Sequence, residues 1–490
     1  MHRPVDPPIP AFGFSHSYAE GLPHFALDTA PESAPAPRLI RFNRALASEL
    51  GLDADAVEPV AHLVFSGTRL PPDARPVAQA YAGHQFGGFS PQLGDGRAHL
   101  LGEVIDRTGT RRDIALKGSG QTPFSRRGDG KATLGPVLRE YLMGEAMAAL
   151  GVPTTRVLAA VTTGEPVFRE TELPGAVLAR VAASHIRVGT FQFFAARGEV
   201  DRVSALLDYA IARHDPDLVG ADNRALAFLQ AVADRQARLI AQWMGLGFIH
   251  GVMNTDNMAV SGETIDYGPC AWMEGYAPGT VFSSIDHTGR YAYANQPLIL
   301  GWNLARLAET LLPLIDADED RAVDAAMGVL GAVKDRYEAE WTVVMRAKLG
   351  LRGADAGDRD LALGLLSAME GQGADWTLTF RRLADAAEGD AGMLRPLFAD
   401  PARLDAWLPR WRARAGDGAA PRLRAANPIY VPRNHLVEAA LAAAHQCDLA
   451  PFDRLLAALE HPFESRPGLD DLALPAPEGF LRGYRTYCGT

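Results

Sequence analysis

Apolar side chains recur at helical spacing over several long stretches of the chain. Across residues 225–244 they fall three or four positions apart, which places them on one face of an α-helix. The pattern ends in a Gly-Leu-Gly sequence, and glycine commonly closes a helix. The same reasoning predicts helices over residues 37–50, ending at Gly51, over 135–150, over 298–312, stopped by Pro313, and through most of 321–460.

Shorter stretches alternate apolar and polar residues, which is the two-residue period of a half-buried strand. They predict strands over residues 99–106 and 112–118, and the turn-forming residues at 107–110 join these two strands into a β-hairpin. Two further strands are predicted over 156–162 and 175–181. The β-rich part of the chain therefore precedes the helical part.

This distribution divides the chain into four predicted parts. Residues 1–75 are rich in proline and carry one predicted helix, so we expect an N-terminal extension wrapped on the main body. Residues 76–182 form a β-rich lobe and 183–345 a helical lobe. Residues 346–490 form a helical C-terminal extension. Because strands and helices are segregated along the chain, the predicted fold class is α+β.

Composition excludes several classes of protein. The chain has 490 residues, of which 47% are apolar and 22% charged, as in an ordinary globular protein. Its net charge of −11 is opposite to that of a non-specific nucleic-acid binder. We find no run of 18 apolar residues and no secretory signal at the Pro-rich N-terminus. We therefore expect a cytoplasmic protein that binds neither nucleic acid nor membrane and acts as a monomer.

Only four lysines occur in the chain, and two of them, Lys117 and Lys131, lie in its most glycine-rich part. On the predicted strand, Ala115 and Lys117 face one side, while Ile114 and Leu116 face the other. Upstream, the Gly94-Asp-Gly96-Arg97 turn allows close approach of its backbone N–H groups to phosphate oxygens. A simple tight turn and a solvated lysine remain an alternative interpretation.

Glu140 lies in the helix that follows the lysine strand. A carboxylate facing inward at this position would pair with Lys117 and hold its ammonium group in place. A glutamate in mid-helix otherwise usually faces water, so the pairing depends on both residues being present together.

Two acidic loops follow the long apolar helix at 225–244. Asn257 and Asp266 carry hard oxygen atoms, which Mg²⁺ prefers where it shares a site with phosphates. Asp256 places a carboxylate beside them that is able to take a proton. The alternative, two turns with capping side chains, accounts for single residues but not for the ordered pair of loops.

The order of these features resembles the protein-kinase fold: glycine-rich loop, lysine strand, helix glutamate, catalytic loop and metal aspartate. Ile114-Ala-Leu-Lys117 is similar to the kinase lysine strand, and Asp266-Tyr-Gly to the kinase Asp-Phe-Gly motif. The kinase base should stand five residues before Asn257, where this chain has Val252. A two-lobed, kinase-like fold is therefore predicted, with ordinary γ-phosphoryl transfer in doubt.

Longer motifs resemble one family in particular, the selenoprotein O (YdiU) family, from about residue 10 to the last residue. They are FGGFSPQLGDGR at 86–97, LKGSGQTPFSRRGDG at 116–130, HGVMNTDN at 250–257, IDYGP at 265–269, NPIYVPRN at 427–434 and YCGT at 487–490. The resemblance implies a pseudokinase that transfers AMP from ATP to hydroxyl groups of protein substrates, with the nucleotide bound in reverse orientation.

The resemblance also implies roles for individual residues. Asp256 matches the proton acceptor, Glu140 the partner of the lysine, and Asn257 with Asp266 the ligands of Mg²⁺, with Mn²⁺ as an alternative ion. Asp266 also matches a nucleotide-binding position. The other nucleotide-contact positions are matched by Gly94, Gly96, Arg97, Lys117, Asp129, Gly130, Arg180 and Arg187.

Arg180 and Arg187 lie seven residues apart at the junction of the predicted lobes. Two guanidinium forks there would clamp departing pyrophosphate, and a salt bridge at the junction is the alternative. Two other functions stay open: a kinase that uses Asp256 as substitute base, and a non-catalytic nucleotide-binding scaffold.

Three cysteines do not make a disulfide framework. A disulfide between Cys270 and Cys488 would tether the C-terminal tail near the proposed metal site and act as a redox switch. The alternative is that Cys270 is a small buried apolar residue and Cys488 has no such role.

Overall fold

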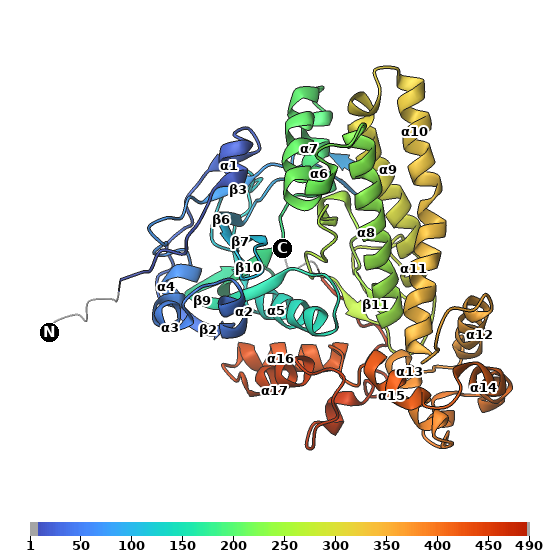
Figure 1. The fold of residues 1–490 in the computed structure, drawn as a ribbon. Helices are drawn as coiled ribbons and strands as arrows, with labels where there is room; N and C mark the ends of the chain where they lie inside the picture. Colours follow the sequence, from blue (N-terminus) through green and yellow to red (C-terminus); the bar gives the residue numbers. More distant parts are fainter. Residues whose placement is uncertain (1–7, 488–490) are drawn as a thin grey trace.

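A computed structural model describes residues 8–487, and Figure 1 shows a sheet on the N-terminal side of the molecule with long helices beside it. In the described residues this sheet has eight strands, and every pairing that joins them is antiparallel. Seven of them follow the order β1 (Ala26–Asp28), β3 (Val77–Gln79), β6 (Ala98–Ile105), β7 (Arg111–Lys117), β10 (Glu172–Ala182), β9 (Arg156–Phe168) and β2 (Arg38–Phe42), and β8 (Ala132–Thr133) pairs with β10.

Two small sheets lie apart from this one. β4 (Gly83–Gln85) and β5 (Gly88–Ser90) form a hairpin between β3 and β6. β11 (Phe248–Ile249) pairs with β12 (Ala271–Trp272), and the two acidic loops lie between these strands. Asp256 itself lies in a single 3₁₀ turn, η3 (Thr255–Asn257).

Helices make up most of the rest of the chain. The N-terminal ones are α1 (Ser17–Gly21), α2 (Arg44–Glu49), α3 (Ala54–Val57) and α4 (Ala61–Phe65). The central ones are α5 (Leu134–Ala149), α6 (Val188–Ala195), α7 (Val200–His214), α8 (Arg224–Leu246), α9 (Gln296–Ile315), α10 (Glu319–Gly331) and α11 (Val333–Lys348). The C-terminal ones are α12 (Asp358–Met369), α13 (Trp376–Ala387), α14 (Pro401–Ala415), α15 (Ala419–Ala426), α16 (Asn434–His445) and α17 (Ala450–Leu459).

The two faces of the sheet are covered by different parts of the chain. On β7, Ile114 and Leu116 belong to a cluster with the apolar residues of α2, α3 and α4. Ala115 belongs to the main core, which continues through α5 into the central helices. The alternation of side chains along β7 therefore leaves Lys117 on the same side as α5.

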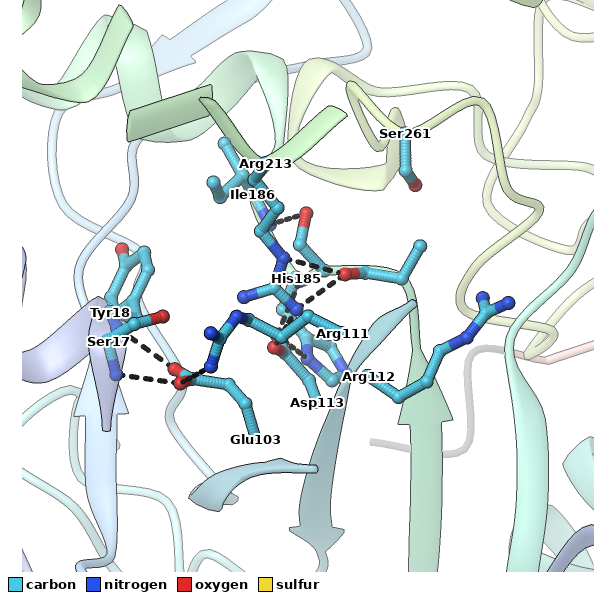
Figure 2. Close-up of polar contacts among 12 residues, drawn as sticks. Ser17, Tyr18, Glu103, Arg111, Arg112, Asp113, His185, Ile186, Arg213 and Ser261 are labelled. Carbon is cyan, nitrogen blue, oxygen red and sulfur yellow. Dashed lines mark hydrogen bonds and ion pairs between the residues drawn. The ribbon is translucent and has the colours of Figure 1, made fainter. Parts of the chain in front are cut away.

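Buried polar contacts anchor the N-terminal segment to the sheet. Glu103 on β6 accepts hydrogen bonds from the backbone N–H groups of Ser17, at 2.7 Å, and Tyr18, at 2.9 Å, as Figure 2 shows. This carboxylate satisfies two of the donors that the start of α1 leaves free. At the other end of the chain, α16 and α17 pack against α5 (Figure 1).

The α+β fold class is confirmed, and so are several elements. The predicted hairpin is β6–β7, and the predicted helices at 135–150 and 225–244 are α5 and α8. α8 closes at Gly247 in the left-handed conformation. The strands predicted at 156–162 and 175–181 are longer, because β9 and β10 continue toward each other as a hairpin. The division into four parts stays a prediction.

Three predictions about elements are wrong. Residues 38–42 are a strand that pairs with β9, so the helix predicted over 37–50 begins only after Asn43, whose side chain caps α2. Residues 8–75, the described part of the N-terminal extension, hold four α-helices rather than one. Pro313 does not stop α9, which ends at Ile315. A proline so close to the end removes one hydrogen bond from a helix that is about to finish.

One helix in the described residues, over 293–315, is long and apolar enough to cross a membrane. Half of its apolar window is buried inside the protein, and α9 packs against α6, α8 and α10. These contacts are those of a helix in the core of the molecule (Figure 1).

Candidate active site

A cleft of about 500 Å³ is lined on one side by β7, β10 and α5 and on the other by the acidic loops. We call Lys117, Glu140 and Arg180 the sheet wall, and Asp256, Asn257 and Asp266 the loop wall. Every site residue singled out in the sequence lines this cleft: these six together with Gly94, Gly96, Arg97, Asp129, Gly130 and Arg187.

Lys117, the last residue of β7, joins two acidic side chains. Its Nζ donates to Glu140 Oε2 at 2.6 Å and to Asp266 Oδ1 at 2.7 Å. Glu140 is buried in the second turn of α5, so it does not face water as a mid-helix glutamate usually does. The ammonium group is therefore held between the two walls of the cleft.

Two arginines converge on the same loop carboxylate. Arg180 Nη1 donates to Asp266 Oδ1 at 2.8 Å and to Glu140 Oε1 at 3.3 Å. Arg187 Nη1 donates to Asp266 Oδ2 at 3.0 Å, and its guanidinium lies over the ring of Tyr81. Burial opposes ionisation of Asp266, but Lys117 and the two arginines outweigh it and hold its pKa well below the usual range.

Asp266 also has an unusual backbone conformation, with φ at +63°. A non-glycine residue in this region is strained, and such strain is concentrated at functional sites. The three cations that bind its carboxylate hold Asp266 in this conformation.

Asp256 is buried on the opposite side of the cleft from the sheet. Gln85 Nε2 donates to its Oδ2 at 3.0 Å, whereas Oδ1 has no partner among the described residues. Burial raises the pKa of Asp256 to about 6. Gly83 leaves room for this carboxylate, because a Cβ at that position would come within 2.5 Å of Oδ1.

The β4–β5 hairpin covers the loop from Asn254 to Asp256. Beside the Gln85 contact, the His84 N–H donates to Thr255 Oγ1 at 2.7 Å, and the Phe86 N–H donates to Asn254 Oδ1 at 3.2 Å. These bonds join residues about 170 positions apart in the sequence and fix the loop that carries Asp256.

Asn257 uses only part of its hydrogen-bonding capacity within the protein. Its amide nitrogen donates to the carbonyl of Val252 at 2.9 Å. This orientation leaves the amide oxygen available as a ligand at the cleft. Val252 itself is buried, so the position of the usual kinase base is occupied by an apolar side chain.

The glycine-rich rim packs against the loop at 118–130. Gly94, with φ at +71°, lies so close to Phe124 that a Cβ would meet its ring at 2.3 Å. Gly130 has φ at +67°, and a Cβ there would meet the backbone of Gly120 at 2.1 Å. Gly94 is therefore required by the packing of the rim against this loop, and Gly130 by the packing within the loop itself.

Asp129 is already engaged by the protein. Arg169 donates to both of its carboxylate oxygens, at 2.8 and 3.2 Å, and the Lys131 N–H donates to it at 3.0 Å. Burial opposes it, but these donors lower the pKa of Asp129. The carboxylate is thus ionised and fixed at the rim of the cleft, beside Arg97 and Gly130.

The residues of the cleft that were missed in the sequence include Tyr81, Gln85, Asp95 and Arg169. Asp95 stands inside the Gly-x-Gly turn and is buried, with a carboxylate oxygen 3.9 Å from Arg187. Its position between Gly94 and Gly96, both candidate site residues, is a signal in the sequence that could have identified it. Gln85, Tyr81 and Arg169 reach the site only through the fold, and no spacing in the sequence marks them.

Neither cysteine of the described residues, Cys270 or Cys447, lines the cleft. Cys270 is buried, its thiol donates to the carbonyl of Tyr267 at 3.2 Å, and burial raises its pKa to about 12. These are the properties of a small structural residue. Cys447 is exposed, and Cys488 lies outside the described residues, so the disulfide between Cys270 and Cys488 stays a prediction.

The chain is similar to known proteins over nearly its whole length. Residues 10–460 match the family model described as "Protein adenylyltransferase SelO". A protein of Cereibacter sphaeroides named "Protein nucleotidyltransferase YdiU" is 68% identical over 480 residues, which cover 98% of this chain and 100% of that protein. Proteins of the same name from Chromobacterium violaceum and Rhizobium rhizogenes are 59% and 58% identical, over 96% and 99% of this chain and 100% and 97% of their own lengths.

Proposed function

Because this chain belongs to the SelO family of protein adenylyltransferases, we propose that it transfers AMP from ATP to the hydroxyl groups of Ser, Thr or Tyr in proteins and releases pyrophosphate. The observation that carries the proposal is the convergence of Lys117, Arg180 and Arg187 in one cleft, opposite the buried carboxylate of Asp256. Positive charge for the phosphates and a proton acceptor for the hydroxyl thus share one cavity.

The cationic side chains supply the binding energy for the triphosphate. Arg180 and Arg187 present planar forks that suit phosphate oxygens, and Lys117 adds a compact point charge. All three bind the single carboxylate of Asp266, and Lys117 and Arg180 also bind Glu140, so they are fixed in place before the nucleotide arrives. Such preorganised charge stabilises the transition state without reorganisation.

The proton acceptor completes the reaction. The hydroxyl oxygen of the acceptor forms a bond to the α-phosphorus, and the bond from that phosphorus to the α,β-bridging oxygen breaks. The hydroxyl proton passes to the carboxylate of Asp256, and the electron pair leaves with pyrophosphate. With a pKa of about 6, Asp256 is mostly ionised at neutral pH and still basic enough to accept the proton.

The donor atoms of the loop wall fit a magnesium ion shared with phosphates. Asp266 offers a carboxylate, and Asn257 offers an amide oxygen that no donor among residues 8–487 occupies. Among residues 8–487 there is no group of three or more His, Cys, Asp or Glu side chains arranged to hold a metal. That fits Mg²⁺, which usually takes one or two carboxylates and binds the phosphates directly. When bound, the ion neutralises phosphate charge, and Mn²⁺ suits the same ligands.

The remaining assignments follow from the same proposal. Asp129, Gly130 and Arg97 at the rim would contact the base or ribose of a nucleotide bound in reverse orientation. The partners are ATP and hydroxyl-bearing proteins, and we propose a monomer acting in the cytoplasm.

A labelling experiment tests the proposed reaction. The protein is incubated with Mg²⁺, a mixture of acceptor proteins and ATP labelled at either the α- or the γ-phosphate. We expect the α-label to become protein-bound and the γ-label to appear in pyrophosphate. Protein-bound γ-label would instead show a kinase, and binding of ATP with neither label transferred would show a scaffold. Asp256→Asn serves as the control for background labelling.

A further inference from the structure

The buried guanidinium of Arg180 has a third contact, away from the acidic residues of the cleft. Its Nε donates to Nε2 of His185 at 3.2 Å, while Nη1 is bound to Asp266 and Glu140. A guanidinium carries no acceptor, so His185 Nε2 must be the acceptor and its proton must lie on Nδ1. Both side chains are almost fully buried.

Asp113 on β7 fixes that tautomer. Its Oδ2 accepts from His185 Nδ1 and from the His185 backbone N–H, both at 2.9 Å. Its Oδ1 accepts from Arg213 on α7 at 2.5 Å (Figure 2). Burial lowers the pKa of His185, and Arg213 with the His185 bonds lowers the pKa of Asp113 to about 2 although burial opposes this. Asp113 is therefore the charged partner and His185 the neutral one.

The junction around this contact is held from both sides. Arg213 also donates to the carbonyl of Ala183, at 2.9 Å from Nε, and Glu263 accepts from the Ala183 N–H at 2.8 Å. The segment that leads from β10 to α6 thus has little freedom, and the imidazole cannot turn away from Arg180 without breaking bonds to Asp113.

We propose that His185 is a positioning residue for phosphate binding: oriented by Asp113, it holds the guanidinium of Arg180 in the direction that meets the nucleotide. The inference rests on the proposed function, because it assumes that phosphates occupy this cleft. The contact through Nε leaves the outer edge of the guanidinium free to exchange Asp266 and Glu140 for phosphate oxygens. A fork held in this way loses less conformational freedom when the ligand binds.

Two polar substitutions separate this role from one that depends only on the bond to Asp113. In His185→Gln, the side chain is long enough to place its amide oxygen near the position of Nε2, where it accepts from Arg180. In His185→Asn, the shorter amide reaches the position of Nδ1, so it keeps the contact to Asp113 and loses the one to Arg180. Positioning predicts that Asn is the more harmful variant, whereas a role confined to the Asp113 bond predicts that Gln is.

The measurements are the dissociation constant of ATP by titration calorimetry and kcat/KM for transfer of α-labelled AMP. We expect kcat/KM to fall about 10-fold or more for His185→Asn, as for loss of one hydrogen bond to a charged group. We expect His185→Gln to stay within about 3-fold of the wild type, a small part of that loss. Gln as harmful as Asn, or more so, would overturn the proposal.

A double-mutant cycle gives a second, independent answer. In an Arg180→Ala background the guanidinium is absent, so His185→Asn should cause no further loss of ATP affinity. An equal loss in both backgrounds would show that His185 acts without Arg180 and would refute the positioning role. Arg180→Ala alone tests the premise: unchanged ATP affinity in that single variant would reject the proposed nucleotide site itself.

Discussion

The sheet wall and the loop wall of the cleft place their side chains by different means. Lys117 and Arg180 belong to paired strands, and Glu140 to a four-turn helix whose apolar face lies in the core. Asp256, Asn257 and Asp266 belong to loops between two strands of two residues each. The register of the sheet and the packing of α5 fix the positions of the first group. Single hydrogen bonds and ion pairs fix those of the second group.

This difference implies a division of labour. A sheet with many ladder bonds holds cations at fixed separations, which suits the binding of a triphosphate. A loop held by a few side-chain contacts is tuned by each of them, as Gln85 and Arg187 show at Asp256. We therefore expect changes in the loop wall to have effects on chemistry, on stability and on pH dependence that can be separated from one another.

The largest expected effect is on chemistry, at Asp256. Asp256→Asn keeps the size of the side chain and removes the proposed proton acceptor, so kcat for AMP transfer should fall by about 10²- to 10⁴-fold. Since the proposed phosphate contacts are made by other residues of the cleft, the dissociation constant of ATP should change little. Steady-state kinetics and titration calorimetry check the two parts. A variant with wild-type kcat would show that another group takes the proton.

The same comparison explains what the sequence could predict. Alternation along β7 places Lys117 opposite Ile114 and Leu116, and a periodic apolar helix predicts α5 with Glu140, because both depend on local spacing. The position of Gln85 against Asp256 depends on a hairpin packed on a loop 171 residues away, and no local pattern encodes it.

Errors at 38–42 and at Pro313 have the same origin. Residues 38–42 form β2 because β9, more than 100 residues later, offers a free edge, and this pairing overrides local helical spacing. The rule that a proline stops a helix does not consider how close Pro313 lies to the natural end of α9. The elements and residue order of the sheet wall were accessible from sequence, whereas the contacts that support the loop wall required the fold.

The next effect concerns stability, at Asp266. Asp266→Asn removes the charge that Lys117, Arg180 and Arg187 share. It leaves Lys117 and Arg180 with Glu140, and Arg187 with the more distant Asp95, as their remaining carboxylates. Breaking a buried charge cluster costs about 3 kcal/mol or more, so the midpoint of thermal unfolding should fall by several degrees.

Asn257→Ala is the matched control for that measurement. It removes a proposed cation ligand whose side chain makes one hydrogen bond to the described residues, with the Val252 carbonyl, so its unfolding midpoint should stay close to that of the wild type. Both variants should lose AMP transfer. Equal unfolding midpoints for Asp266→Asn and wild type would show that the cations do not depend on this carboxylate.

The smallest expected effect is a pH dependence of stability, at Glu263, which ties the loop before Asp266 to Ala183 at the junction. Burial raises the pKa of Glu263 to about 7 from 4.5, so between these values the folded state binds more protons than the unfolded state. Glu263 therefore contributes most to the stability of the folded state below about pH 4.5. This contribution is lost as the pH rises through 7, by about 3 kcal/mol at most.

Glu263→Gln keeps an acceptor for Ala183 without the charge, so it should unfold at a higher temperature than the wild type at pH 8 and at a similar one at pH 5. Glu172→Gln, at an exposed position on β10, is the control and should shift neither value. If Glu263→Gln were less stable than the wild type at pH 8, the carboxylate would have to be ionised and favourably paired there, with Arg112 at 3.7 Å as its nearest cation.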